Sequence, residues 1–169
     1  MMILVAGGSK CGKSRYAESL FEKRTEPKYY LATMRPYGEE AHAAIARHRT
    51  MRANKGFLTV EQYTEIDRAA IPEGSAVLLE CMGNLLANEM FRGDTITDCA
   101  DKIVTEILRL YRKTKLLVIV TSQVCSDGMQ YENGTAAYAA ALGKINQALA
   151  KKADRVIECV YGIPVKVKG

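Results

Sequence analysis

The segment GGSKCGKS at residues 7–14 constrains the fold more than any other part of this chain. It matches the pattern G-x-x-x-x-G-K-[S/T] at every specified position. A short apolar run at 2–6 precedes it, and a helix-forming stretch at 13–23 follows it. Glycines let such a loop turn successive backbone N–H groups toward one point at the start of a helix, and this arrangement holds an anion. The order strand, loop, helix therefore predicts a phosphate-binding loop for a nucleoside triphosphate, rather than a Gly-rich turn that binds nothing.

Two side chains of this loop have roles of their own. Lys13 supplies a positive charge for the outer phosphates, and the Ser14 hydroxyl can ligate Mg²⁺. We interpret Cys11 as a small filler residue and not as a catalyst. The residues expected to cradle the phosphates are Gly7, Gly8, Ser9, Lys10, Cys11, Gly12, Lys13 and Ser14.

Length and composition indicate one ordinary globular domain over residues 1–169. A chain of 169 residues with 48% hydrophobic and 25% charged residues can bury a sizeable core. The net charge of +5 suits anionic small substrates. The chain has no dense Lys/Arg run and no basic stretch interleaved with aromatic residues, so we expect no nucleic-acid partner.

The cysteines and the apolar runs bear on location. The five cysteines are scattered and lack a C-x-x-C pair, so we expect reduced thiols rather than a disulfide framework or a zinc site. The first apolar run is only as long as a strand and leads into the loop, which argues against a signal peptide. No segment approaches the ~18 apolar residues of a membrane span. These features predict a cytoplasmic protein without membrane insertion.

Short apolar runs alternate with helical patterns, which is typical of an α/β fold with a mostly parallel sheet and helices on both faces. Buried strands are expected at 2–6, 29–33, 76–81, 116–121 and 155–161, and more exposed strands at 57–62 and 165–168. Two later stretches show apolar residues at helical spacing. Their predicted buried stripes are Ala100, Ile103, Val104, Ile107, Leu108 and Tyr111 in one, and Ala137, Ala141, Ile145 and Leu149 in the last.

Polar residues that directly follow the apolar runs are candidate site residues, because ligands of open α/β sheets bind at the carboxyl ends of the strands. Glu80 follows the run at 76–79 and could hold Mg²⁺ directly or through water; the alternative is a surface carboxylate at a strand end. Thr33 ends another run, and Thr-Ser-Gln at 121–123 follows a third. These groups could orient a phosphate or a water molecule, or could simply cap strands.

Both histidines of the chain, His42 and His48, lie in a predicted helix at 39–52. His48 falls on or beside a stripe of apolar residues, whereas His42 falls on another face. The arginines nearest to His48 are Arg47, Arg49 and Arg52. Nearby cations disfavour protonation, so we expect a neutral, nucleophilic imidazole near neutral pH, and the arginines could bind a triphosphate. Taken alone, the same pattern also fits a solvated basic helix face.

Taken together, these segments resemble the bifunctional adenosylcobinamide kinase/adenosylcobinamide-phosphate guanylyltransferases of cobalamin assembly. The match runs nearly end to end, through MILVAGGSKCGKSRYAE, YYLATMRPYGEEA, AIARHRTMRANKGFLTVE, VLLECMGNLLANEMF and INQALAKKADRVIECVYGIPVKVK. The phosphate loop alone is not specific. The Arg-His-Arg helix, the Leu-Leu-Glu-Cys strand and the Gly-Ile-Pro-Val-Lys ending, in this order, are much more so.

The resemblance implies a P-loop, RecA-like α/β domain that assembles as a homotrimer. It implies that ATP or GTP phosphorylates the aminopropanol hydroxyl of adenosylcobinamide, and that GMP then passes from GTP to this phosphate through a GMP–histidine intermediate. His48 matches the modified histidine, although some relatives have a histidine one residue earlier, where Arg47 stands here. Beyond the phosphate loop, the nucleotide contacts that the resemblance implies are Thr33, Arg49, Thr50, Met51, Arg52, Glu61 and Glu80.

The chain departs from the family pattern near the expected corrinoid side. Many relatives have Asn-Glu-Val-Gly where this chain has Ser-Gln-Val-Cys at 122–125, so Gln123 replaces a carboxylate. Ala136, Ala137 and Ala139 stand where arginines are expected. These departures bear on corrinoid handling and on the kinase step. Two alternatives stay open: a P-loop small-molecule kinase without a covalent histidine, and a non-enzymatic nucleotide-binding regulatory module.

Overall fold

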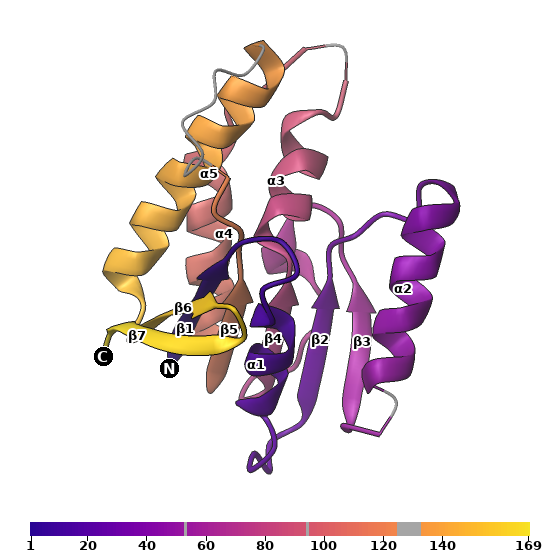
Figure 1. Cartoon of the computed structure of the whole chain (residues 1–169), viewed down its shortest axis with the longest axis vertical. Helices are drawn as coiled ribbons and strands as arrows, with labels where there is room; N and C mark the ends of the chain where they lie inside the picture. The colour runs from indigo at the N-terminus through magenta and orange to yellow at the C-terminus, as the bar shows by residue number, and fades with distance from the viewer. Residues whose placement is uncertain (53, 94, 125–132) are drawn as a thin grey trace.

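A seven-stranded sheet runs through the centre of the molecule, with helices on both of its faces (Figure 1). The structure is a computed structural model that describes residues 1–169 except 53, 94 and 125–132. Its elements in chain order are β1 (Met2–Gly7), α1 (Lys13–Ser19), β2 (Lys28–Ala32), α2 (Gly38–Arg52), β3 (Phe57–Glu61), the 3₁₀ helix η1 (Ile66–Arg68), β4 (Ala76–Glu80), α3 (Met82–Met90), α4 (Ala100–Lys113), β5 (Leu116–Val120), α5 (Asn133–Lys152), β6 (Arg155–Val160) and β7 (Ile163–Lys168).

The strand order is β3-β2-β4-β5-β1-β6-β7. Every neighbouring pair is parallel except β6 and β7, which form an antiparallel hairpin at one edge. The carboxyl ends of β1, β2, β4 and β5 therefore meet at one edge of the sheet, as an α/β fold requires. Register pairs Ala32 with Glu80, so these two strand ends lie side by side.

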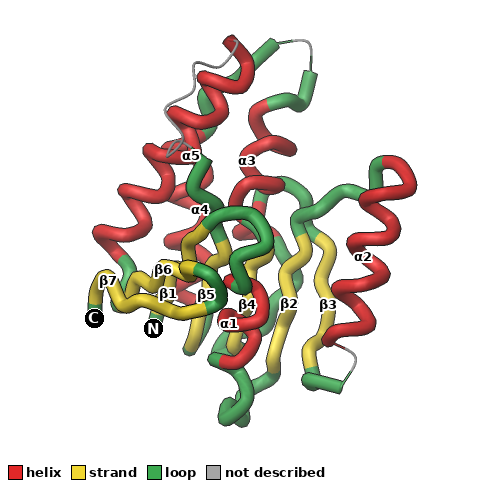
Figure 2. The backbone as a smooth tube through the Cα atoms, in the orientation of Figure 1, coloured by secondary structure: helices red, strands yellow, loops and turns green. Residues whose placement is uncertain are grey.

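Alternating residues of each central strand face two separate cores. Met2 and Leu4 of β1 belong to a core built with α3, α4 and α5. Ile3 and Val5 of the same strand belong to a second core with α1 on the other face. This double burial accounts for the continuous apolar sequences of the strands. Figure 2 shows the two helical layers, and α2 stands beside β3 at the far edge.

All seven expected strands are present, and each lies within two residues of its predicted bounds. The five residues of β5, LLVIV, are all buried. As expected, β3 and β7 are more exposed than the other strands. The prediction of an α/β fold with a mostly parallel sheet is confirmed.

Two helices differ from the prediction. The first, α1, ends at Ser19 and not at 23, since the chain then turns toward β2. The second, α3, was not predicted at all, because its sequence continues directly from the apolar strand β4. Its apolar residues Met82, Leu85 and Leu86 are nevertheless fully buried at helical spacing.

The buried stripe of α4 is narrower than predicted. Ile103 and Ile107 are fully buried, and Leu110 completes the stripe one turn later. Val104, Leu108 and Tyr111, which were expected in the stripe, are only partly buried. Packing of α4 against α5 and η1 turns one line of side chains into the core and leaves the flanking lines at the rim. No helix among the described residues has both the length and the apolar character to cross a membrane.

Candidate active site

A cavity of about 600 Å³ lies at the carboxyl ends of the central strands. Its walls come from the loop after β1, from β2, β3 and β4, and from α2 and α3. The lining residues are Ser9, Lys10, Lys13, Ser14, Tyr30, Ala32, Met34, Ile45, Arg49, Arg52, Thr59, Glu61, Glu80, Cys81, Asn84, Val120 and Ser122. Most of the charged residues predicted for the site therefore share one cavity.

The loop between β1 and α1 is packed so closely that two of its positions require glycine. A Cβ atom added to Gly7 would lie 2.6 Å from Cys11 Sγ and 2.7 Å from the carbonyl oxygen of Cys159. Gly12 has a φ of +91°, a left-handed conformation that other residues rarely adopt. The Nζ atom of Lys13 donates to the carbonyl oxygen of Gly8 at 2.7 Å, which folds this side chain over the loop.

The Glu80 carboxylate connects the loop to β2. Its Oε1 accepts a hydrogen bond from Ser14 Oγ, and its Oε2 accepts one from the Tyr30 hydroxyl at 3.1 Å. Glu80 is only 9% exposed, so these two donors stabilise a carboxylate that is largely removed from water. Burial, together with the Glu80 charge, raises the pKa of Tyr30, which keeps its hydroxyl protonated as a donor.

Arg52, the last residue of α2, is the most unusual side chain of the cavity. It is 5% exposed, and its guanidinium carbon lies 3.2 Å from the centre of the Tyr30 ring. Its Nε and Nη1 atoms are buried and have no hydrogen-bond partner among the described residues. A buried cation with unsatisfied donors is costly. Arg52 also lines the cavity and therefore offers an anion there a positively charged partner.

A more exposed ion pair, between Arg49 and Glu61, also lines the cavity. Arg49 Nη2 lies 2.5 Å from Glu61 Oε1, and the Tyr63 hydroxyl donates to Glu61 Oε2 at 2.8 Å. The hydrogen bond from Tyr63 and the ion pair with Arg49 hold the pKa of Glu61 below its usual value, although partial burial opposes them. Glu61 is thus a charged acceptor at the end of the edge strand and not an isolated surface acid.

The Ser14 hydroxyl and the Glu80 carboxylate are oxygen donors in contact, which suits Mg²⁺. Among the described residues, no group of three or more His, Cys, Asp or Glu side chains could hold a metal ion. A magnesium site here would need the phosphates of a nucleotide to complete its coordination, as is common for this ion.

Comparisons with known proteins agree with this geometry. The sequence model of the family described as "Cobinamide kinase / cobinamide phosphate guanyltransferase" matches residues 3–167. The chain belongs to this family. It is 34% identical over 184 residues to the "Bifunctional adenosylcobalamin biosynthesis protein CobU" of Escherichia coli (strain K12), which covers 99% of this chain and 100% of the relative. The protein of the same name from Salmonella typhimurium is 33% identical over the same shares of both chains.

A solved structure of a helicase ATPase domain has a TM-score of 0.51 and 11% sequence identity to this chain, and the match covers 93% of this chain and 68% of the other. This likeness concerns the fold alone. Together with the matching family, it agrees with the P-loop α/β architecture predicted from the sequence.

Not every residue that the family resemblance implies lines the cavity. Thr33 is fully buried, and its hydroxyl donates to the Cys81 carbonyl oxygen at 2.8 Å. The Thr50 hydroxyl donates within α2, to the Ala46 carbonyl oxygen at 3.0 Å. Neither residue lines the cavity: the Thr33 side chain is buried, and the Thr50 hydroxyl, although exposed, donates within its own helix.

The helix α2 carries both histidines. His42 is exposed, and its Nδ1 atom lies 2.8 Å from the Gly38 carbonyl oxygen. His48 lies in the helical backbone of α2, between the cavity-lining residues Ile45 and Arg52. The side chains of Arg47, His48 and Met51 are outside the described part of the structure.

The family departures noted in the sequence are partly visible. Gln123 Nε2 donates to Glu158 Oε1 of β6 at 3.1 Å. Ala136 is exposed near the start of α5, and Ala139 is buried. Cys125 and most of the loop that follows it lie outside the described residues.

Tyr30 is a site residue that sequence reasoning missed, although it stands three residues before Thr33 in the strand that was predicted. It connects Glu80 with Arg52, and neither contact could be inferred before the strand order was known. Alternation along β2 could have shown only that Tyr30 and Tyr29 face opposite sides of the sheet.

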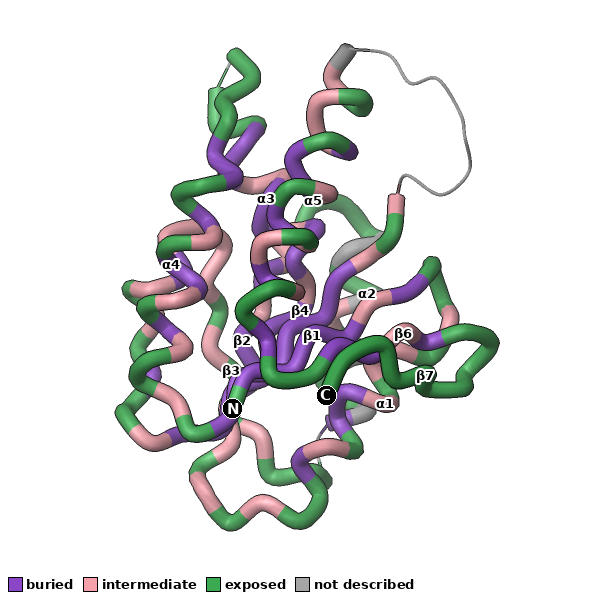
Figure 3. Tube along the Cα trace, turned by 90° about the vertical axis from the view of Figure 1, so that its left-hand side faces the viewer, coloured by how far each residue is buried: buried purple, intermediate pink, exposed green. Residues whose placement is uncertain are grey.

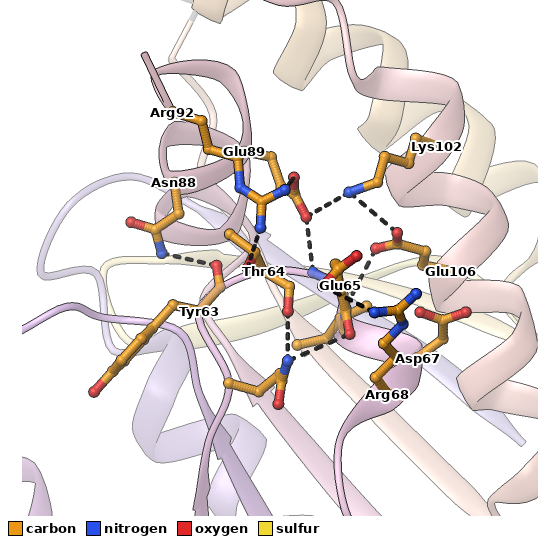
Figure 4. A network of polar contacts seen from close by, with 12 residues as sticks. Tyr63, Thr64, Glu65, Asp67, Arg68, Asn88, Glu89, Arg92, Lys102 and Glu106 are labelled. Carbon is orange, nitrogen blue, oxygen red and sulfur yellow. Dashed lines mark hydrogen bonds and ion pairs between the residues drawn. The ribbon is translucent and has the colours of Figure 1, made fainter.

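A network of polar residues from α3, α4 and the segment after β3 was also not predicted from the sequence (Figure 4). Asn88 of α3 donates to the carbonyl oxygens of Thr33 (2.7 Å) and Tyr63 (3.0 Å). This amide ties together the chain segments that follow β2 and β3. Glu89, 4% exposed, accepts a hydrogen bond from the backbone N–H of Glu65 at 2.8 Å.

Lys102 of α4 joins Glu89 to Glu106, at 2.7 and 3.2 Å (Figure 4). Burial raises the pKa of Glu106 by more than Lys102 lowers it. For Glu89, burial acts in the same direction, but the hydrogen bonds from Lys102 and the Glu65 amide outweigh it and leave the pKa below its usual value. The network holds in place the segment after β3. This segment contains Tyr63, which donates to Glu61 at the end of β3.

Proposed function

We propose that this protein is a cobinamide kinase and cobinamide-phosphate guanylyltransferase of cobalamin biosynthesis. It phosphorylates adenosylcobinamide with ATP or GTP and then transfers GMP from GTP to the product. The observation that carries the proposal is the cavity that is lined by residues of the phosphate loop, by the Ser14–Glu80 pair and by Arg49 and Arg52 of α2. The names of the relatives from Escherichia coli and Salmonella typhimurium support it.

In the kinase step, the loop N–H groups and Lys13 stabilise the charge that develops on the γ-phosphate as it moves to the hydroxyl of the corrinoid substrate. Ser14 and Glu80 would hold Mg²⁺, which supplies further neutralisation of phosphate charge when bound. Arg52 lines the cavity and supplies a positive charge that attracts the phosphates.

In the guanylyl step, the neutral imidazole of His48 attacks the α-phosphorus of GTP, a P–N bond forms, and pyrophosphate leaves. The phosphate of the corrinoid then attacks the same phosphorus, the P–N bond breaks, and the imidazole is regenerated. The position of His48 supports this role, because it is three residues from Ile45 and four from Arg52, and both of these line the cavity.

The proposal is tested by mass spectrometry of the intact protein after incubation with GTP and Mg²⁺. We expect one added GMP, acid-labile and base-stable, that is absent in His48→Ala and present in His42→Ala. His42 is the matched control, because it is exposed in the same helix. An undiminished adduct in His48→Ala would refute the assigned nucleophile.

The same labelling separates the alternatives. A small-molecule kinase without a covalent histidine would retain no label from α-labelled GTP after denaturation. A non-enzymatic module would not turn over cobinamide with GTP. Lys13→Ala should weaken triphosphate binding and slow both reactions, and an unchanged kinase rate would contradict the role of Lys13.

Assembly and location complete the proposal. The homotrimer implied by the family resemblance is supported by the edge strand β7, whose six residues are all exposed. Light scattering on the purified protein measures its mass directly, and a monomer would overturn the trimer. The cysteines Cys11, Cys81, Cys99 and Cys159 are free thiols, which supports a cytoplasmic location.

A further inference from the structure

A second hollow of about 590 Å³ lies on the other side of the phosphate loop, between this loop and the β6–β7 turn. Ser9 and Lys10 line both this hollow and the first cavity, so the loop forms the rim between them. The residues of α2 line only the first cavity. The function proposed above uses the first cavity and leaves the second without a role.

The position of the Ser14–Glu80 pair determines how a phosphate donor can lie in the loop. Ser14 and Glu80 would hold Mg²⁺, which would neutralise charge on the outer phosphates of a donor. Ser14 and Glu80 both line the first cavity, so the γ-phosphate of a donor lies on that side. The second hollow, on the other side of the loop, is then a free space for the nucleoside of the same donor.

Guanylyl transfer requires the opposite arrangement. Its reacting atom is the α-phosphorus, which must approach α2, and α2 borders only the first cavity. We infer that the chain binds a triphosphate in two opposite orientations, and that the second hollow is a subsite for the purine nucleoside of the kinase donor, with Tyr161 as its stacking platform. This inference rests on the proposed function, because it assigns the two orientations to its two reactions.

Tyr161 has the features of a stacking platform. It is 96% exposed, although it lines the hollow, and it occupies the β6–β7 turn with a φ of +52°. The turn rests on the phosphate loop, because the N–H of Gly162 donates to the Cys11 carbonyl oxygen at 3.0 Å. Figure 3 shows the turn and β7 as exposed chain. A base that stacks on an exposed aromatic ring beside the phosphate loop contributes favourable free energy of binding, whichever base this is.

Glu158 supplies a polar contact in the same hollow. Its carboxylate lines the wall and accepts one hydrogen bond, from Gln123 at 3.1 Å. A carboxylate has capacity for further donors, and the hydroxyls of a ribose are suitable ones. Stacking on a tyrosine together with ribose recognition does not distinguish adenine from guanine. The subsite therefore fits either ATP or GTP as donor.

The chain contains no tryptophan, so Tyr161→Trp introduces a single tryptophan at the proposed platform, which can be excited selectively. We expect ATP with Mg²⁺ to change the emission of this variant in a saturable manner, and inorganic tripolyphosphate to leave it unchanged. Phe91→Trp is the matched control, because Phe91 is also exposed but lies at the end of α3, and its emission should not respond. Equal responses to ATP and tripolyphosphate, or no response, would overturn the inference.

Removal of the Tyr161 ring gives the second test. Tyr161→Ala should raise the Kd for ATP about 5- to 150-fold, and Tyr161→Phe should restore it, because the ring and not the hydroxyl does the stacking. The GTP concentration for half-maximal formation of the GMP adduct should not rise in Tyr161→Ala. A parallel rise would show one shared orientation, and a response of the Tyr161→Trp variant to cobinamide alone would make the hollow an acceptor site. If instead the proposed function were wrong, the protein without substitutions would form no GMP adduct, and this outcome is distinct from those above.

Discussion

Replacement of Arg52 by methionine separates binding from stability at one position. The guanidinium is 5% exposed, and two of its three nitrogens have no hydrogen-bond partner among the described residues. Methionine keeps most of the aliphatic packing and removes the buried charge. Replacement of buried ionic groups by apolar ones is often neutral or stabilising by about 1–4 kcal/mol. Loss of the cation–π contact with Tyr30 costs up to about 2 kcal/mol.

These two effects oppose each other, so we expect the free energy of unfolding of Arg52→Met without nucleotide to lie between about 2 kcal/mol below and about 4 kcal/mol above the original value. Nucleotide binding should instead weaken strongly. Hydrogen bonds to charged groups contribute about 1.5–3 kcal/mol, which corresponds to about a 10- to 150-fold rise in Kd. Urea unfolding followed by circular dichroism measures the first quantity. Calorimetric titration with α,β-methylene GTP, which cannot lose pyrophosphate, measures the second.

Arg49→Met is the matched control for stability, because Arg49 is exposed and already paired with Glu61. It should lower the free energy of unfolding by less than about 1 kcal/mol. If Arg52→Met bound the nucleotide as tightly as the original protein, the role of Arg52 as an anion partner would be refuted. A loss of much more than about 2 kcal/mol of stability would show that the guanidinium has partners that its burial conceals.

Three further changes have expected outcomes. Gly7→Ala places a Cβ 2.6 Å from Cys11 Sγ. We therefore expect loss of triphosphate binding and a free energy of unfolding lower by about 1–3 kcal/mol. Unimpaired binding would contradict the close packing of the loop. Ile103→Ala, at a fully buried site, should lower the free energy of unfolding by about 2–5 kcal/mol in urea, and a neutral effect would be inconsistent with the α4 core. The N–H of Met2 donates to Asp154 at 2.6 Å and lowers the pKa of this carboxyl. The stability that ionised Asp154 contributes is therefore present above the usual carboxyl pKa of about 4 and is lost as pH falls below it. In Asp154→Asn, the free energy of unfolding should depend less on pH in the acid range. Identical pH profiles of the two proteins would exclude this contribution.

Local patterns in the sequence were sufficient for the scaffold and for the part of the site that is continuous in the chain. The phosphate loop combines its glycines, lysine and serine within eight residues, so its function could be predicted without knowing what surrounds it. Central strands are apolar on both faces, and their continuous apolar runs marked the five buried strands to within two residues. The strands β3 and β7 were predicted as more exposed strands with the same accuracy. Glu80 could be assigned to the site because ligands bind where parallel strands end.

The structure was needed wherever a property depends on segments that are distant in the chain. Tyr30 meets Glu80 because β2 pairs with β4, and Arg52 becomes buried because the end of α2 brings its guanidinium over the Tyr30 ring. The sequence of α2 could not show whether its arginines form a solvated basic face or whether one of them, Arg52, is buried. The second hollow likewise exists only because the β6–β7 turn is hydrogen-bonded to the phosphate loop.

The sequence by itself determined which residues form strands and which loop binds phosphate, because backbone preferences and apolar periodicity act over a few neighbours. Only the tertiary structure decided which charges lose their water and which face each other, since burial and pairing depend on the order of strands in the sheet. The chemistry of this protein depends on both, with a locally encoded loop placed against arginines and a tyrosine that the fold brings to it.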